Sequence, residues 1–307
     1  WGIKNLPAVN ETEQSYVDYI IGGEHSIIRR WLRAGASGWR LDVADELPDE
    51  FIARIRRAIE EERPDGYLLG EVWEDGTTKI AYSKRRKYLL GRETHGLMNY
   101  PFRTALLDYL RGGDAAVFRE RMEELREHYP APAYYGAMNF LSTHDTPRLL
   151  TLLGHEGDAP ATRDERAAYR LSGEERARGT ALLKLAALIL YTFPGSPMLY
   201  YGDEAGMQGF EDPFNRGPYP WGHEDTALLC YFRQLGALRK AHEALQRGTI
   251  DYCAAQGRVL AFRRTSEGER CIAVVNAGEQ SAALTLPWNA PLAQDALTRQ
   301  SFFCCDG

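Results

Sequence analysis

Residues 38–44 read GWRLDVA, a short apolar run that carries one carboxylate, Asp42, near its end. Apolar residues at helical spacing lie on both sides of this run, over Glu13–Ala34 and again after Pro48. A second apolar run with one carboxylate, Tyr67–Trp73, follows the second helical pattern. Strands that alternate with helices in this order predict an α/β fold with a parallel sheet.

Two more segments place a carboxylate after an apolar run. LGEVW at residues 69–73 contains Glu71, and STHDTPR at residues 142–148 contains Asp145. The interval from Asp42 to Glu71 is about one βα unit, roughly 30 residues, and the interval to Asp145 holds about two units with long loops. Catalytic groups of a (β/α)8 TIM barrel lie at the carboxyl ends of different strands. The spacing therefore predicts that the three carboxylates meet on one face of such a barrel.

Three acidic side chains on three strands suit the cleavage of a glycosidic bond. A retaining glycosidase uses one carboxylate as nucleophile and one carboxylic acid as proton donor, around an oxocarbenium-like transition state. A further anion nearby stabilises the positive charge that develops on the sugar. Asp42, Glu71 and Asp145 can supply these three groups, so the sequence predicts a retaining glycosidase.

The composition indicates a folded chain without a surface for nucleic acid. Of the 307 residues, 44% are hydrophobic and 26% are charged, which is enough to bury a large core. The net charge of −6 argues against binding of a phosphate backbone, which needs concentrated Lys and Arg. The most apolar stretch, Leu182–Phe193, contains Lys184 and is shorter than the ~18 residues of a membrane span. We expect neither a nucleic-acid nor a membrane partner.

The five cysteines have no spacing typical of a metal site. Their odd number, with Cys304 and Cys305 adjacent, favours reduced thiols and a cytoplasmic protein. No motif indicates a nucleotide, flavin or redox cofactor. We therefore expect no cofactor and assign no metal ligand.

The sequence pattern changes near residue 248, from helical spacing to period-two alternation with turn residues between the runs. We divide the chain into a partial (β/α)8 catalytic barrel at residues 1–247 and a small antiparallel β-sandwich domain at residues 248–307. The other expected elements are a helical stretch at 103–128, strands at 140–143 and 196–201, a long loop at 154–172, helices at 173–192 and 225–246, and C-terminal strands at 259–264, 271–276 and 282–286.

The motifs and their order resemble glycoside hydrolase family 13, the α-amylase family, and within it the neopullulanase, cyclomaltodextrinase and maltogenic amylase branch. Residues 38–44 are similar to the family's second signature, 70–73 to the third and 143–148 to the fourth. The first signature and barrel strands one to three have no counterpart here. The resemblance thus implies the C-terminal part of a longer chain, with about strands 4–8. Such a partial barrel exposes sheet edges, so we expect no activity from the isolated 307 residues.

The resemblance implies that Asp42 is the nucleophile, that Glu71 is the general acid and then the base, and that Asp145 stabilises the transition state. Arg40, two residues before Asp42, would keep that carboxylate ionised, and a less polar environment would hold Glu71 protonated. The substrate-binding residues implied in the same way are Arg40, His144, Glu46, Trp73, Asp212 and Arg216.

By this resemblance the protein hydrolyses α-1,4 or α-1,6 glucosidic bonds in maltodextrin, cyclodextrin or starch-type glucans by double displacement. The α-glucan oligosaccharide is its expected partner. The resemblance allows a structural calcium in the missing N-terminal part and a homo-oligomer of the full-length protein. Two alternatives stay open. One is a transglycosylase or isomerase of the same superfamily, of the trehalose synthase or branching type, and the other is a catalytically inactive relative that binds carbohydrate as a scaffold.

Overall fold

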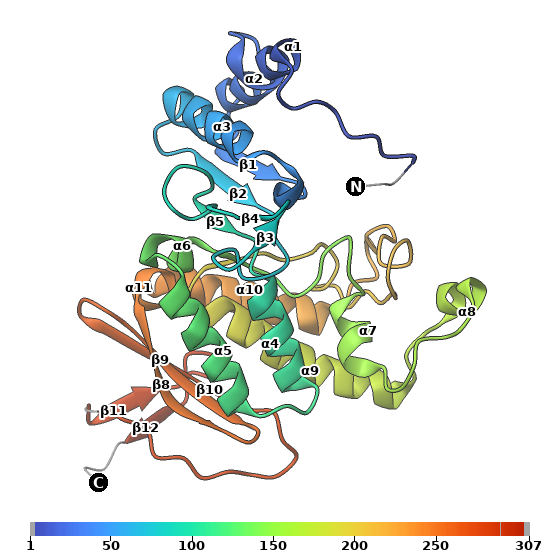
Figure 1. Cartoon of the computed structure of the whole chain (residues 1–307). Helices are drawn as coiled ribbons and strands as arrows, with labels where there is room; N and C mark the ends of the chain where they lie inside the picture. The colour runs from blue at the N-terminus through green and yellow to red at the C-terminus, as the bar shows by residue number, and fades with distance from the viewer. Residues whose placement is uncertain (1–3, 289, 304–307) are drawn as a thin grey trace. The chain divides into compact units, whose positions relative to one another are not determined.

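The computed structural model describes residues 4–288 and 290–303 (Figure 1). The chain forms two compact units, of which the first comprises Trp1–Pro101 and Glu123–Asn139 and the second Phe102–Met122 and Phe140–Gly307. Each unit has its own hydrophobic core. Among the described residues, no helix combines the length and apolar character that crossing a bilayer requires.

The first unit is built on a three-stranded parallel sheet in the order β1–β2–β5. β1 (Gly38–Leu41) pairs with β2 (Tyr67–Gly70), and β2 pairs with β5 (Gly96–Leu97). The other elements of this unit are α1 (Gln14–Val17), the π-helical turn η1 (Asp18–Gly22), α2 (Ile27–Arg33), the 3-10 turn η2 (Ala44–Glu46), α3 (Asp49–Glu62), the hairpin β3 (Ile80–Ala81) and β4 (Lys84–Arg85), α6 (Ala131–Gly136) and β6 (Met138–Asn139).

Helix α3 connects β1 to β2 and anchors the first core. Its buried side chains recur every three to four positions and share one face: Phe51, Ile52, Ile55, Ala58 and Ile59. This face packs with α2, β2 and the C-terminal part of the unit in one cluster. The packing holds β1 and β2 side by side, so the residues that follow both strands lie at one edge of the sheet.

The second unit has a helical layer and antiparallel sheets. Helix α9 (Gly173–Thr192) packs against α7 (Leu149–Gly154) and α10 (Thr226–Ala241). β8 (Thr249–Gln256), β9 (Val259–Ser266) and β10 (Glu269–Asn276) form a sheet with β9 in the centre, and β11 (Leu292–Gln294) pairs with β12 (Ser301–Phe303). The remaining elements are α4 (Tyr100–Leu110) and α5 (Ala115–His128), which also reach into the first unit, α8 (Arg163–Ala168), β7 (Ser196–Pro197) and α11 (Glu243–Arg247).

Local sequence signals set the position of α9. A capping box begins the helix, because the Ser172 hydroxyl accepts from Glu175 N (3.2 Å) and the Glu175 carboxylate accepts from Ser172 N (2.8 Å). Glycines allow α9 to approach α7 closely, since a Cβ on Gly179 would lie 2.9 Å from the Gly154 Cα. Any side chain at either glycine would push the two helices apart.

Three predicted helices are divided in the structure. The predicted helix 225–246 forms α10 and α11, with His242 between them. The predicted helix Glu13–Ala34 ends at Gly22 and restarts at Ile27, because Gly22–Gly23 is a poor helix former. The predicted helix 103–128 is divided into α4 and α5, since Gly112 adopts φ +125°, which ends a helix. The predicted loop 154–172 contains α8, whose first turn has its own capping box at Thr162.

Several predicted strands are shorter than expected or absent. The 140–143 and 282–286 segments form no strand, whereas β8, which the sequence analysis did not predict, pairs along β9. The 196–201 segment is a strand over Ser196–Pro197 alone. At the end of the 140–143 segment the Thr143 amide donates to the Thr146 hydroxyl at 2.9 Å, within its own loop. The antiparallel strands begin at Thr249, close to the predicted domain boundary at residue 248. The second compact unit extends across this point, since it also contains α9. The division into a barrel and a β-sandwich domain therefore stays a prediction.

A buried carboxyl in the first unit makes its stability depend on pH. Glu93 is 4% exposed, and burial, with Asp49 nearby, raises its pKa to about 7. Because the folded-state pKa lies above the ordinary value of 4.5, the stability that Glu93 contributes is complete below about pH 4.5 and is lost as the pH rises through about 7.

We therefore expect Glu93→Gln to stabilise the protein at pH 8 by about 2 kcal/mol and to have little effect at pH 4.5. Urea unfolding at the two pH values measures this difference. Glu127→Gln, at an exposed position of α5 in the same unit, is the matched control. Equal pH dependence of the two variants would contradict the prediction.

Candidate active site

The structure brings Asp42 and Glu71 to one edge of the parallel sheet. β1 ends at Leu41, opposite Gly70 at the end of β2, so the next residue of each strand carries a carboxylate. The Glu71 amide donates to the Leu41 carbonyl at 3.0 Å and extends the ladder by one residue. The two side chains therefore emerge next to each other from neighbouring strands.

Arg40 on β1 contacts both carboxylates. One guanidinium nitrogen, Nη1, lies against Asp42 Oδ1, and Nη2 lies 3.0 Å from Glu71 Oε2. The side chain of Asp42 is 71% exposed, whereas Glu71 is 4% exposed. The guanidinium of Arg40 thus lies between two carboxyl groups that come from neighbouring strands. The sequence analysis predicted that Arg40 interacts with Asp42 and binds substrate, but it did not predict the contact with Glu71.

A strained backbone turn positions Glu71. Val43 adopts φ 42° and ψ 55°, a left-handed conformation that is unusual for a β-branched residue and costs about 1–3 kcal/mol. In this conformation the Val43 amide donates to Glu71 Oε2 at 2.9 Å. The next amide, of Ala44, donates to the Glu71 carbonyl at 3.1 Å. The strain is thus located where the chain holds the buried carboxyl.

Two aromatic side chains hold the other oxygen of Glu71. The indole nitrogen of Trp73 and the phenol of Tyr100 both donate to Oε1 at 3.2 Å. Their rings stack with centroids 4.5 Å apart and planes 15° from parallel. Trp73 is 53% exposed and Tyr100 is 3% exposed. The sequence analysis predicted a site role for Trp73 but did not assign Tyr100 as a partner of the acid.

The environment of Glu71 differs from the predicted one. The carboxyl is buried, but four donors face it: Arg40, the Val43 amide, Trp73 and Tyr100. The expectation of a less polar environment is therefore wrong. These contacts fix the orientation of both oxygens, which a group that delivers a proton to one defined atom requires.

A hollow of about 1060 Å³ adjoins Asp42 within the first unit. Its lining also includes Glu46, part of the β3–β4 hairpin and the segment Asn5–Val9. The Tyr82 hydroxyl donates to the Glu46 carboxylate and holds it at this hollow. The volume slightly exceeds the ~300–1,000 Å³ typical of small-molecule sites, so the hollow has room for more than one sugar ring.

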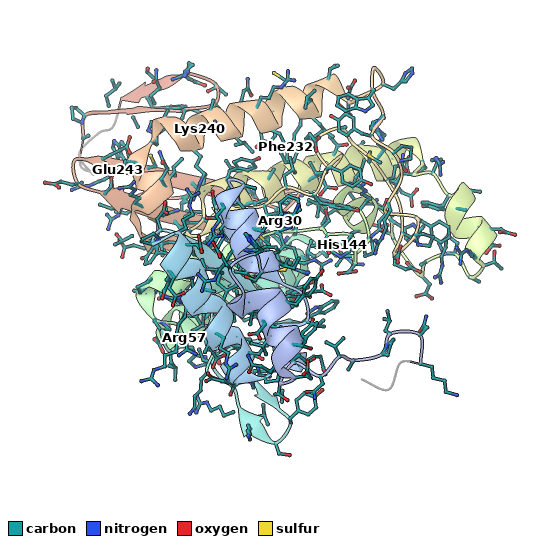
Figure 2. All side chains as sticks on the ribbon, turned by 90° about the horizontal axis from the view of Figure 1, so that it is seen from above. Arg30, Arg57, His144, Phe232, Lys240 and Glu243 are labelled. Carbon is teal, nitrogen blue, oxygen red and sulfur yellow. The ribbon has the colours of Figure 1, made fainter. Side chains whose placement is uncertain are left out.

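The second unit brings the other four predicted residues together. The His144 imidazole Nε2 lies 3.2 Å from Asp145 Oδ2, and Arg216 Nη2 lies 3.7 Å from Asp145 Oδ1. Arg216 Nε also contacts Asp212 Oδ1 at 2.8 Å. His144 and Asp145 are exposed and follow the buried Thr143. Figure 2 labels His144. These side chains form a connected polar set that can hydrogen-bond a ligand rich in hydroxyl groups.

Asn215, which the sequence analysis did not assign, holds the backbone of this set. It is fully buried, and its amide nitrogen donates to the His144 and Thr146 carbonyls, both at 2.8 Å, and to the Thr143 carbonyl at 3.3 Å. It therefore ties the loop of Asp145 to the loop that carries Arg216. Its place beside Arg216 is the one local signal that could have indicated a site role.

A buried ion pair supports the loop that carries His144 and Asp145. Arg148 is fully buried, and its guanidinium lies 3.5 Å from the Asp203 carboxylate and stacks on the rings of Tyr200 (4.2 Å) and Tyr201 (4.5 Å). The Ser142 hydroxyl donates to the same carboxylate. Both ends of the segment 142–148 are thus attached to Asp203, another residue to which the sequence analysis gave no role.

Comparisons with known proteins identify the family of this chain. Residues 2–226 match the family described as "Alpha amylase, catalytic domain". An amylopullulanase of Thermoanaerobacter thermohydrosulfuricus is 34% identical over 288 residues, which cover 86% of this chain and 18% of that protein. A cyclomaltodextrinase of Geobacillus thermopakistaniensis (strain MAS1) is 32% identical over 295 residues, 94% of this chain and 44% of the relative.

A solved structure titled "Cyclomaltodextrinase" superimposes with a TM-score of 0.77 at 31% identity, over 96% of this chain and 46% of that one. The chain therefore spans less than half the length of each of these relatives. The family match includes Asp42, Glu71 and Asp145 and confirms the resemblance drawn from the motifs. This chain belongs to the α-amylase family, as part of a catalytic domain with a TIM-barrel fold.

Proposed function

We propose that the protein containing this chain is a retaining hydrolase of α-glucans, acting on α-1,4 or α-1,6 glucosidic bonds. The observation that carries this proposal is the contact of Arg40 with two carboxylates from neighbouring parallel strands. Nucleophile and acid are close together in retaining glycosidases, whereas inverting enzymes leave room between them for a water. The relatives named cyclomaltodextrinase and amylopullulanase support an α-glucan substrate.

The proposed reaction has two displacements. Asp42 attacks the anomeric carbon, the bond to the leaving oxygen breaks, and Glu71 gives its proton to that oxygen. A β-linked glycosyl-enzyme results. Glu71 then takes a proton from water, the water oxygen attacks the same carbon from the α face, and Asp42 leaves as a carboxylate. The exposed position of Asp42 and the buried, oriented position of Glu71 support this assignment.

The other site residues are proposed to bind sugar. Asp145 and His144 would hydrogen-bond hydroxyls of the sugar at the cleaved bond. Asp212 and Arg216 would hydrogen-bond the next glucose. On the leaving-group side, the exposed indole of Trp73 can stack on the apolar face of a sugar ring, beside Glu46. We further propose that the chain supplies about strands 4–8 of a TIM barrel.

The anomeric form of the first product tests the mechanism. The full gene product that contains this chain is incubated with maltoheptaose, and proton NMR follows the new reducing ends before they mutarotate. Retention predicts that the α anomer appears first, with glucose and maltose as final products. Early β anomer would overturn double displacement, longer or branched glucans would indicate a transferase, and no turnover would indicate a binding scaffold.

A further inference from the structure

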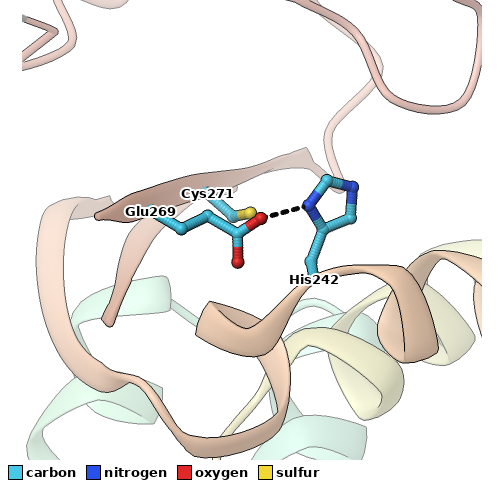
Figure 3. A group of neighbouring side chains, drawn as sticks. All are labelled: His242, Glu269 and Cys271. Atoms are coloured by element: carbon cyan, nitrogen blue, oxygen red, sulfur yellow. Dashed lines mark hydrogen bonds and ion pairs between the residues drawn. The ribbon is translucent and has the colours of Figure 1, made fainter. Parts of the chain in front are cut away.

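Three side chains with metal-binding atoms meet far along the chain from the carboxylates described above. Figure 3 shows His242, Glu269 and Cys271 turned toward one another. Their ligand atoms, an imidazole nitrogen, a carboxylate oxygen and a thiol sulfur, all lie within 4.8 Å of one another. Among residues 4–288 and 290–303, this is the one group of three or more such side chains with that spacing.

The fold itself brings the three together. His242 is the single residue between α10 and α11. Figure 2 labels Lys240 in the last turn of α10 and Glu243 at the start of α11. Glu269 and Cys271 lie on β10, two residues apart, so their side chains point to the same face of the sheet. All three side chains are half-buried, which limits competition from water without closing the group to an ion.

The orientation of the group is fixed before any ligand binds. Glu269 Oε2 accepts from the Ala244 amide at 2.8 Å, which leaves Oε1 to face His242 Nδ1 at 2.7 Å. The Cys271 thiol is free of disulfide. The group also lines a hollow of about 630 Å³, whose other walls are largely apolar and include Leu188, Leu245 and Trp288. A small species can therefore reach the three ligand atoms from that side.

The combination of nitrogen, oxygen and sulfur ligand atoms favours some metal ions over others. Thiolate disfavours Ca²⁺ and Mg²⁺, which prefer oxygen ligands, whereas Zn²⁺ binds Cys, His and carboxylate together in tetrahedral sites. With metal–ligand distances of about 2.0–2.3 Å, the ligand atoms of such a site are about 3.3–3.8 Å apart. On binding, the 2.7 Å distance between His242 Nδ1 and Glu269 Oε1 would lengthen slightly, and the longer distances in the group, up to 4.8 Å, would shorten. Small side-chain rotations allow both changes.

We propose that His242, Glu269 and Cys271 bind one Zn²⁺, with the fourth position open to the adjoining hollow. The ion would link the junction of α10 and α11 to the edge strand β10. It would therefore stabilise the contact between helices and sheet in the second unit. This role is separate from glycoside hydrolysis and does not depend on the proposed function.

Two simpler explanations account for part of the arrangement. A hydrogen-bonded pair of His242 and Glu269 would explain the 2.7 Å contact, but it gives no role to the thiol beside it. A reactive cysteine would explain the thiol, but it gives no role to the His242–Glu269 pair held beside it. A metal explains all three side chains at once.

Cobalt reports directly on the thiolate. We use the full chain, freed of any affinity tag, with Cys304 and Cys305, which lie outside the described residues, replaced by serine. Titration with Co²⁺ should give a thiolate-to-cobalt charge-transfer band in the near ultraviolet and reach one ion per chain. Zn²⁺ should displace the cobalt and raise the Tm. Absence of the band, or of any rise in Tm, would overturn the proposal.

Variants identify the ligands. Cys271→Ser should abolish the charge-transfer band and weaken Zn²⁺ binding at least about 10-fold, and His242→Gln should weaken it similarly. Cys253→Ser is the matched control, because Cys253 is a half-buried thiol on β8 of the same sheet. Circular dichroism of each variant checks that it is folded. If Cys253→Ser lowers the affinity as much as Cys271→Ser, the ion is bound elsewhere and the proposal is wrong.

Discussion

Replacing Asp42 by glycine should lower kcat/KM for maltoheptaose by at least about 10⁴-fold in the full gene product, since the covalent route is lost. Azide should restore turnover, because it fits the space of the missing side chain and attacks the same carbon. Attack opposite an α-linked leaving group gives a β-glycosyl azide. NMR of the isolated azide therefore identifies Asp42 as the nucleophile by the stereochemistry of the product, independently of the size of the rate loss.

Replacing Glu71 by alanine should affect the kinetics and the azide product differently from replacing Asp42. Turnover of natural glucans should fall about 10²–10⁴-fold, the usual contribution of a general acid. α-Maltosyl fluoride should still form the glycosyl-enzyme rapidly, because fluoride leaves without a proton. Azide then attacks this β-linked intermediate, and the product is an α-glycosyl azide. The ratio of rates for the fluoride and maltoheptaose measures how much of the loss is due to proton transfer.

The control for both variants is Asp45→Asn, a nearby carboxylate that pairs with Lys79 at 3.0 Å and has no part in the proposed reaction. It should keep turnover within about twofold of the parent, because its carboxylate pairs with Lys79 and not with a group of the proposed reaction. If Asp42→Gly gave the α-glycosyl azide and Glu71→Ala gave the β-glycosyl azide, the roles of the two residues would be the reverse of those proposed. Full activity of Asp42→Gly would show that the nucleophile lies elsewhere.

The sequence was informative where local signals act alone. The run 38–44 is short, apolar and bounded by turn residues, so both its strand and the carboxylate after it were predictable. The same holds for Glu71 after β2. Pairing of neighbouring parallel strands then brings these two side chains together without further information, since equivalent strand ends lie at one edge.

The sequence was much less informative where contacts join distant segments. Asn215 donates to carbonyls about 70 positions earlier, and no local pattern indicates which amide has this role. Tyr100 looks like one more aromatic core residue, although its hydroxyl reaches Glu71. The group of His242 and Cys271 has no motif spacing, because β10 reaches the helix junction only through the folded sheet. The roles of such residues become visible only in the folded structure, because the periodicity of the sequence does not indicate them.

Arg148 and Asp203 provide the largest expected effect on stability. Arg148→Met removes a fully buried guanidinium and leaves the Asp203 carboxylate, 3% exposed, without its cation. Breaking a buried pair on one side costs about 3–5 kcal/mol. We therefore expect the Tm to fall on the order of 10 °C. Loss of the ring contacts with Tyr200 and Tyr201 adds to this effect.

The pH dependence of that loss separates charge from packing. Burial already raises the pKa of Asp203 to about 6, although Ser142 and Arg148 lower it, so the pKa rises further when Arg148 is removed. The folded-state pKa lies above the ordinary value, so stability is lost as the pH rises through it. The deficit of Arg148→Met should therefore be larger at pH 8 than at pH 5. Adding Asp203→Asn should recover most of that difference in urea unfolding, whereas a deficit that is equal at both pH values would assign the role of Arg148 to packing alone.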